Sequence, residues 1–276
     1  MNNKIKSSFV RLVVKLSALV TFGTLFFIIG YILYRGVPAL RPSMFEFEYS
    51  STNVSMFPSI ITTIMLVFST LIIVTPIGVF TGFYLVEYAN KGNKFVDLIR
   101  IATETLSGVP SIVYGLFGML FFVYRLNFSY SLIAGIFTAA IMVLPLIIRS
   151  TEEALMAVDD SLREASFGLG AGKLRTIFIV VLPVAMPGIL SGVILAIGRI
   201  VGETAALIYT LGTATKMTDS LFSSGRTLAT HMYVLSSEGL HVNESFATGV
   251  VLLITILIIN GISTYLSNKL TKGRID

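Results

Sequence analysis

The chain has 276 residues, of which 54% are apolar and 13% charged, and its mean hydropathy is +0.86. This composition excludes an ordinary soluble domain and is typical of an integral membrane protein. The absence of cysteine excludes disulfides and thiol-ligated metals, and the two histidines lie far from any clustered carboxylates, so neither a metal site nor a cofactor is expected.

Uncharged apolar runs divide the chain into candidate membrane spans. A helix needs about 20 residues to cross the hydrocarbon core of a bilayer, and six runs are long enough. The sequence therefore predicts an all-α integral membrane protein with six transmembrane helices. Pro58 and Pro76 are expected to mark the entry and a kink of the second run, and the fifth run is expected to continue to about Thr213. The runs are Leu16–Tyr34, Met56–Val86, Thr105–Tyr124, Leu126–Ile148, Thr176–Gly198 and Ser245–Asn268.

Lysine and arginine are distributed unequally between the connecting segments. The predicted topology places 14 of them on one side of the membrane and five on the other. Because cytoplasmic segments carry the positive excess, both termini and residues 151–182 are predicted to be cytoplasmic. Topology thus explains the formal net charge of +5, and a nucleic-acid partner is not expected. The inner set is Lys4, Lys6, Arg11, Lys15, Lys91, Lys94, Arg100, Arg149, Arg163, Lys173, Arg175, Lys269, Lys272 and Arg274, and the outer set is Arg35, Arg41, Arg125, Lys216 and Arg226.

Two parts of unequal size are expected. Residues 1–55 form an N-terminal segment with the first span and an outer loop, and residues 56–276 form a five-helix core. Residues 212–244 form a second outer loop, which holds both histidines. Residues 93–107 are predicted to form an amphipathic segment at the membrane interface. Its apolar face comprises Phe95, Leu98, Ile99 and Ala102.

The inner loop, residues 151–182, is rich in charge and glycine. Ser161 and Glu164 have the spacing of a capping box, in which each side chain accepts a hydrogen bond from the backbone amide of the other residue. A short helix is therefore predicted to begin at Ser161. Gly170 and Gly172 are expected to end it, because glycine readily adopts the left-handed conformation found at helix ends. Small and apolar side chains form one stripe, Leu162, Ala165, Ser166 and Leu169.

The same loop resembles a family signature. Glu164-Ala-Ser166, then Gly170, then Val180-Val-Leu-Pro183 are similar to the EAA motif of ATP-binding cassette (ABC) importer permeases, with departures at Ser166 and Val180. The resemblance implies the type I importer permease fold, whose cytoplasmic coupling helix docks on ATPase subunits. The alternative is an ordinary amphipathic loop helix. The coupling residues that the resemblance implies are Ser161, Arg163, Glu164, Ala165, Gly168 and Gly170.

Two charged residues, Arg199 and Glu203, lie in the extension of the fifth run. Each costs about 2.5–3.5 kcal/mol at the centre of a span. Their i, i+4 spacing predicts an ion pair on one helix face. Two interpretations remain open, a structural ion pair that holds the bundle together and a polar lining for a charged substrate. Glycines at positions 188, 192, 198 and 202 are expected to let a neighbouring helix approach this helix closely.

Catalysis is not expected in this chain. The stretch from Gly168 to Lys173 is similar to a phosphate-binding loop, but Phe167 replaces its first glycine and Leu174 its Ser/Thr. No nucleophile–base pair is evident either, so the sequence predicts neither an ATPase nor another enzyme.

Three further stretches resemble permeases of the phosphate-specific transport system. Gly198-Arg-Ile-Val-Gly-Glu-Thr-Ala205 is similar to their GR(I/A)xGET stretch, Ser107–Gly115 to their third-span entrance, and Arg149–Glu152 to their fourth-span exit. The residues after Glu203 are more similar to PstA-type than to PstC-type permeases. The polar path that the resemblance implies comprises Arg149, Glu152, Arg199 and Glu203.

This second resemblance implies a set of partners in the plasma membrane of a bacterium. They are a PstC-like second permease, two cytoplasmic ATPase subunits and an extracytoplasmic phosphate-binding protein. Three alternatives remain. The cargo is another oxyanion or a small nutrient, the chain is a channel or secondary transporter that works without ATP, or it is a purely regulatory membrane subunit.

Overall fold

The computed structural model describes residues 2–89 and 92–272, and within these ranges the regular structure is entirely helical. Lys91 and Arg274, which were counted as inner charges, lie outside the described residues. Five helices are long and apolar enough to cross a membrane, and a bent helix pair raises the number to six. This agrees with the all-α fold predicted from the sequence, whereas the division at residue 55 stays a prediction.

The helices include three short π-helical segments, η3, η4 and η5, and two 3₁₀ turns, η1 and η2. In chain order the elements are α1 (Asn2–Gly36), η1 (Val37–Ala39), η2 (Pro42–Phe45), α2 (Phe57–Phe83), η3 (Tyr84–Tyr88), α3 (Lys94–Ser107), α4 (Ser111–Gly118), η4 (Met119–Arg125), α5 (Leu132–Met156), α6 (Asp160–Gly168), α7 (Lys173–Thr176), η5 (Ile177–Val181), α8 (Leu182–Val201), α9 (Ala205–Ile208), α10 (Leu228–Glu238) and α11 (Val242–Lys272).

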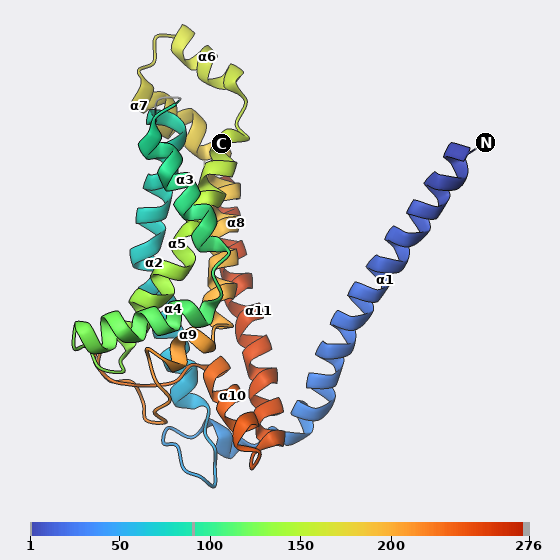
Figure 1. Ribbon diagram of the computed structural model, residues 1–276, viewed down its shortest axis with the longest axis vertical. Helices are drawn as coiled ribbons and strands as arrows, with labels where there is room; N and C mark the ends of the chain where they lie inside the picture. The colour runs from blue at the N-terminus through green and yellow to red at the C-terminus, as the bar shows by residue number, and fades with distance from the viewer. Residues whose placement is uncertain (1, 90–91, 273–276) are drawn as a thin grey trace.

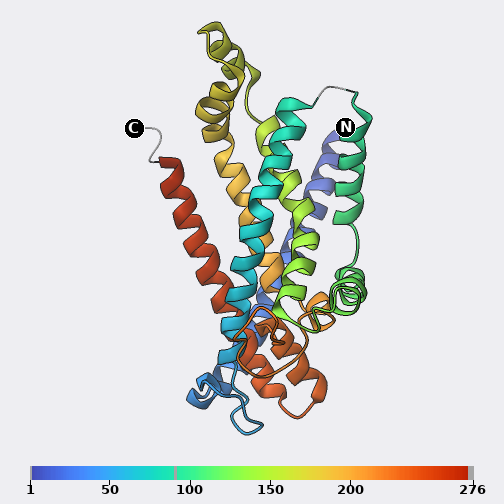
Figure 2. The same ribbon diagram turned by 90° about the vertical axis from the view of Figure 1, so that its left-hand side faces the viewer.

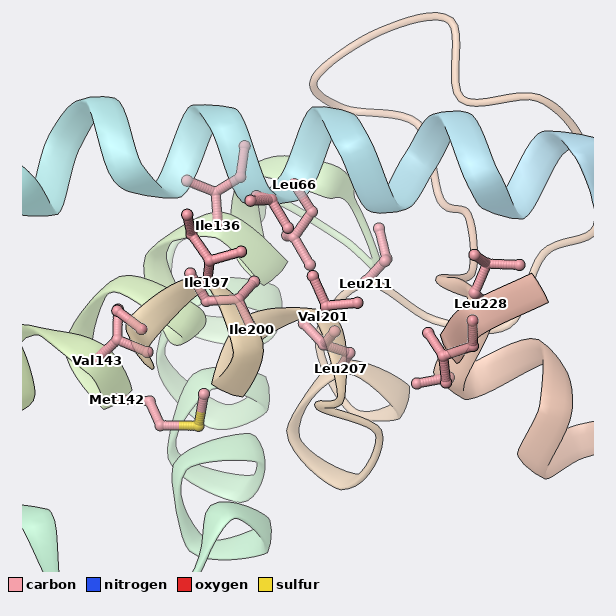
Figure 3. Close-up of a cluster of buried hydrophobic side chains, with 14 of the residues drawn as sticks. Leu66, Ile136, Met142, Val143, Ile197, Ile200, Val201, Leu207, Leu211 and Leu228 are labelled. Carbon is pink, nitrogen blue, oxygen red and sulfur yellow. The ribbon is translucent and has the colours of Figure 1, made fainter. Parts of the chain in front are cut away.

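The core is a bundle in which α5 packs between α2 and α8, and α11 packs along α8. α6 lies at one end of the bundle and α10 at the other, and the start of α1 and the end of α11 lie toward the α6 end (Figures 1 and 2). Apolar side chains from α2, α5, α8 and the α9 region meet in the largest buried cluster (Figure 3). Residues of this cluster include Leu66, Ile136, Met142, Val143, Ile197, Ile200, Val201, Leu207, Leu211 and Leu228.

α1 diverges from the rest of the bundle (Figure 1). None of its most hydropathic window is buried, and within the described chain it contacts α11 and η1 near its own end. Arg35 donates a hydrogen bond of 3.1 Å to the side chain of Asn243 there. The side chains of α1 form a mostly apolar exposed surface and therefore face the bilayer or another subunit.

The predicted third span is broken, which corrects the straight helix expected over Thr105–Tyr124. α3 and the α4–η4 segment meet at a bend of 104° around Pro110. α3 packs along α5 instead of lying apart at the interface. Its buried residue is Val96, whereas Phe95 and Leu98, from the predicted apolar face, are about 60% exposed. The proline, which restricts the residue before it to extended geometry, accounts for the break.

Two other boundaries differ from the predictions. The fifth span ends at Val201 rather than near Thr213, and the short helix α9 follows it. The loop 212–244 contains α10, which begins at the N-cap Thr227 and ends at Gly239 with φ +72°. Pro58 stands in the first turn of α2, as predicted.

Close contact between α5 and α8 depends on two of the four predicted glycines. A Cβ at Gly188 would lie 2.7 Å from the Cβ of Ala154, and one at Gly192 would overlap the side chain of Ser150. A Cβ at Gly198 would meet no atom within 4 Å. The predicted close approach is confirmed at Gly188 and Gly192 but not at Gly198.

We expect Gly192→Ala to lower the thermal midpoint of the detergent-solubilised protein, because overpacking of a close contact costs about 1–3 kcal/mol. Gly198→Ala, on the same helix, is the matched control and should leave the midpoint unchanged or slightly higher. Equal midpoints for the two variants would contradict the proposed packing.

Candidate functional site

α6 is a short helix that is capped differently from the predicted capping box. It begins at Asp160, and the carboxylate of Asp159 accepts a hydrogen bond of 2.8 Å from the amide of Ser161. That bond lowers the pKa of Asp159, so the cap persists above the ordinary aspartate pKa and is lost as the pH falls through the lowered one. The Ser161–Glu164 box was wrong because the aspartate two residues earlier satisfies the Ser161 amide.

The end of α6 confirms the role predicted for Gly170. This residue has φ +83°. The amide of Ala171 donates to the carbonyl of Ser166 at 3.1 Å, and the amide of Gly170 to that of Phe167 at 2.9 Å. These two bonds form a Schellman motif, which requires the left-handed residue.

The surface of α6 is exposed along its whole length, since none of its residues is buried. Leu162 is 40% exposed, Phe167 47% and Leu169, just after the helix, 90%. The side chains of Glu164 and Ala165 are also exposed, and a Cβ at Gly168 would meet no atom within 4 Å. Large apolar side chains at a loop tip with no partner in the described chain indicate a protein-binding surface.

Two residues of α6 face back toward the bundle. Ser166 shares a hydrogen bond of 2.9 Å with Thr176 of α7, and Arg163 is only 14% exposed. Its guanidinium forms an ion pair of 3.0 Å with Glu87 of η3. It also donates to the carbonyls of Leu155 and Val158 at 2.9 and 2.8 Å. One side chain thus joins α6 to the ends of both α2 and α5.

The charges of α5 pair with residues that the sequence analysis did not select. Arg149 binds Glu153 one turn later at 2.9 Å, and both side chains are more than half exposed. Glu152 binds Arg100 of α3 at 2.7 Å. The second pair holds α3 against α5, and the five charged residues including Glu104 line one pocket of about 340 Å³.

Arg199 and Glu203 do not form the predicted ion pair. α8 ends at Val201, so Glu203 leaves the helix face on which Arg199 lies. The carboxylate of Glu203 turns to the next helix and accepts a hydrogen bond of 3.0 Å from the amide of Ala206. The predicted ion pair was wrong because it assumed a continuous helix, whereas α8 ends at Val201 with Gly202 as its C-cap.

Arg199 instead lines an open pocket of about 520 Å³ between α5, α8 and α11. It has no carboxylate partner within the described residues. Asn260 of α11 lines the same pocket, and its Oδ1 is buried without a hydrogen-bond partner. The structure therefore brings an unpaired cation and an unsatisfied amide to one cavity, while Arg149 and Glu152 lie around another.

Sequence reasoning missed Glu87, Arg100 and Asn260. Glu87 and Arg100 stand next to predicted spans, where charged side chains are commonly solvated at the membrane interface. No local spacing in the sequence connects them to Arg163 or Glu152. Asn260 interrupts an apolar run of the last span, and this polar residue in a hydrocarbon segment was the one available signal.

Comparisons with known proteins agree with this geometry. Residues 74–272 match the family described as "Binding-protein-dependent transport system inner membrane component". The chain is 32% identical to the "Probable ABC transporter permease protein YqgI" of Bacillus subtilis, over 99% of this chain and 98% of that protein. It is 40% identical to the "Phosphate transport system permease protein PstA" of Mycobacterium leprae, over 55% of this chain and 49% of that protein.

Two solved transporters share the fold at low sequence identity. A chain of the bacterial alginate ABC transporter, in complex with an alginate-bound periplasmic protein, superposes with a TM-score of 0.66 at 15% identity, over 96% of this chain and 98% of that one. A chain of the inward-facing MetNI methionine ABC transporter gives 0.59 at 19% identity, over 88% and 98%.

We predict that Arg163→Ala increases amide hydrogen exchange in residues 160–168. α6 buries no side chain of its own, and the guanidinium supplies its connections to Glu87 and to the end of α5. Arg149→Ala removes an arginine from an exposed pair, which solvent screens strongly, and should leave exchange in α6 unchanged. Unaltered exchange in Arg163→Ala would show that α6 is held by other contacts.

Proposed function

Because the chain belongs to the family of binding-protein-dependent transport system inner membrane components, we propose that it is a PstA-like permease subunit that imports inorganic phosphate. In this role it forms one half of the translocation path, with a PstC-like permease as the other half. Two cytoplasmic ATPase subunits drive it, and an extracytoplasmic phosphate-binding protein delivers the cargo. The chain itself is not catalytic in this proposal.

The observation that carries the proposal is the exposed α6 anchored by Arg163. A helix with outward apolar side chains and a rigid ionic connection to two spans suits a lever between a soluble motor and the membrane domain. Motion of a docked ATPase would reach α5 through the carbonyls of Leu155 and Val158, and α2 through Glu87. Alternating access then follows from rocking of these two spans.

Phosphate as the cargo rests on three arguments. Several relatives are named as PstA permeases, and the Gly198–Ala205 stretch resembles that group. Arg199 stands in a bundle pocket without an acidic partner. A guanidinium donates two parallel hydrogen bonds to an oxyanion, which suits transient phosphate binding. Arg149 and Glu152 belong to the proposed path as paired charges near its cytoplasmic end.

The proposed orientation places α6 and both chain ends in the cytoplasm and α10 outside. It is supported by the charge asymmetry of the sequence and by the position of α6, the start of α1 and the end of α11 toward the same end of the bundle (Figure 2). The chain then resides as a multi-pass protein in the plasma membrane of a bacterium.

Uptake of radiolabelled phosphate tests the proposed function. A strain that lacks this chain should lose high-affinity phosphate uptake and regain it from a plasmid copy. Sulfate and molybdate uptake, measured in parallel, are the controls for other oxyanions. Unchanged phosphate uptake together with loss of another anion would replace the cargo but keep the importer.

Leu169→Asp should abolish transport while the chain still reaches the membrane, because Leu169 is 90% exposed and contributes no packing to its own fold. The ATPase subunits should no longer copurify. Lys94→Asp, another charge change on the same side, is the control. Normal ATPase binding by Leu169→Asp would rule out α6 as the docking element.

Arg199→Gln should stop phosphate uptake without loss of assembled complex. Glu203→Ala should instead lower stability by about 1–3 kcal/mol, because the buried amide of Ala206 loses its hydrogen-bond acceptor. Since the two side chains are not paired, their effects on the thermal midpoint should add. A coupling energy above about 1 kcal/mol in the double variant would indicate that they form an ion pair after all.

A further inference from the structure

A buried charged cluster lies at the outer end of the chain, away from Arg199 and α6. It consists of Tyr49, Arg226 and His231, which come from the segment before α2, the loop after α9 and the helix α10 (Figure 1). Cζ of Arg226 lies 4.8 Å from the centre of the Tyr49 ring. The imidazole of His231 stands edge-on to the same ring at 6.2 Å.

Arg226 is buried without an anion. The residue is 4% exposed, and its Nε and Nη2 are fully buried with no hydrogen-bond partner. No ion pair of Arg226 occurs among the described residues. Glu238, at the far end of α10, is the carboxylate that interacts electrostatically with Arg226. An unpaired buried charge costs several kcal/mol, and burial accordingly lowers the pKa of this guanidinium.

The position of Arg226 along the chain adds to this cost. It directly precedes Thr227, the N-cap of α10, so it stands at the positive end of the helix dipole. That end favours anions and disfavours cations. Burial, lack of a carboxylate and the dipole all lead to the same conclusion, that the site is suited to a negative ligand beside the arginine.

His231 supplies a neutral donor next to the arginine. It is 0% exposed, and neither ring nitrogen has a hydrogen-bond partner. Burial and the charge of Arg226 lower its pKa to about 3, so the ring is uncharged at neutral pH. Its single N–H faces the backbone of Val54, which an incoming acceptor would replace. The adjacent backbone is that of Val54, a β-branched residue held at φ +48°, which is an uncommon conformation.

We propose that Arg226 is an oxyanion-binding residue at the outer mouth, which receives the transported anion when the segment carrying Tyr49 separates from α10. Nε and Nη2 occupy one edge of the guanidinium and donate in parallel, so they match two oxygens of a tetrahedral oxyanion. The inference rests on the proposed function, which makes that oxyanion phosphate. A small ion is favoured over a partner's side chain because the cluster is enclosed by three segments of this chain.

The segment over the cluster, residues 46–55, is held together mainly by its own hydrogen bonds, such as those of 2.8 and 2.9 Å that Asn53 donates to Glu46 and to the carbonyl of Glu48. Ser55 connects its end to Met44 and Phe57. The segment contacts the cluster through the Tyr49 ring, which lies against Arg226 and His231. The Tyr49 side chain and the Val54 backbone are the polar neighbours of these two residues. Opening of the segment therefore exchanges these contacts for contacts with the anion.

The test uses the complete importer, with the second permease, the ATPases and the binding protein, in liposomes. We expect Arg226→Gln to retain ATP hydrolysis stimulated by the phosphate-loaded binding protein, but to move about tenfold less phosphate per ATP. Arg226→Lys should recover little, because it keeps the charge and loses the two parallel donors. Arg41→Gln removes an exposed arginine from the same side and is the matched control.

Each other outcome overturns the inference. An unchanged phosphate-to-ATP ratio in Arg226→Gln means that the residue does not handle the anion. Loss of ATPase stimulation means that it acts in docking of the binding protein, and a lower amount of assembled complex means that it acts in folding. Full rescue by Arg226→Lys, or an equal defect in Arg41→Gln, means that the transport defect comes from the loss of positive charge on this side and not from the two parallel donors of Arg226.

Opening of the segment is tested separately. Ser55→Cys places a thiol in a chain that has no cysteine, at a residue that is 1% exposed. An impermeant thiol reagent applied from outside should label it only when a non-hydrolysable ATP analogue is bound. A thiol that stays unlabelled in every state overturns the opening. If the wild-type complex takes up no phosphate at all, the proposed function fails first, which distinguishes the two failures.

Discussion

Close packing of α5 against two glycine-containing helices is the constraint on which the rest of the structure depends. A Cβ at Gly78 or Gly82 of α2 would lie 2.7 Å from side-chain atoms of Ile147 or Thr151, and Gly188 of α8 is equally close to Ala154. Helices in a bilayer gain little from hydrophobic burial against each other, because lipid tails are as apolar as their side chains. Van der Waals packing at small residues supplies the association instead. α5 is thereby fixed between its two neighbours.

A fixed α5 also positions the contacts that hold α6. Its end presents the carbonyls of Leu155 and Val158 to Arg163, and the adjacent end of α2 presents Glu87 from a π-helical turn. π-helical turns are often found at functional sites because they redirect side chains. The ion pair is largely shielded from water, so it is stiffer than an exposed pair. α6 can then extend beyond the bundle with most of its surface exposed and remain connected to both spans.

Charges within the bundle fall into two groups with different physical consequences. The exposed pair Arg149–Glu153 and the Arg100–Glu152 pair are neutralised locally. Arg199 and Arg226 lack carboxylate partners among the described residues. Arg199 lies in α8, and Arg226 lies in the loop before α10. Unpaired arginines are costly in such surroundings. Their cost is offset if an anion passes both, the outer one on arrival and the inner one within the bundle.

The sequence by itself determined the approximate positions of the spans, the position of the short charged helix and its glycine end at Gly170, because these follow from local periodicity and from one residue's access to left-handed geometry. It also indicated close packing at Gly188 and Gly192. Tertiary structure decided the rest. Asp159 displaced Ser161 as the cap, a bend of 104° broke the third span, and the end of α8 separated Glu203 from Arg199. The partners of Arg163 and Arg226 lie 76 and 177 residues away in the chain, at Glu87 and Tyr49. No short-range pattern encodes such contacts, which arise only when packed helices bring distant segments together.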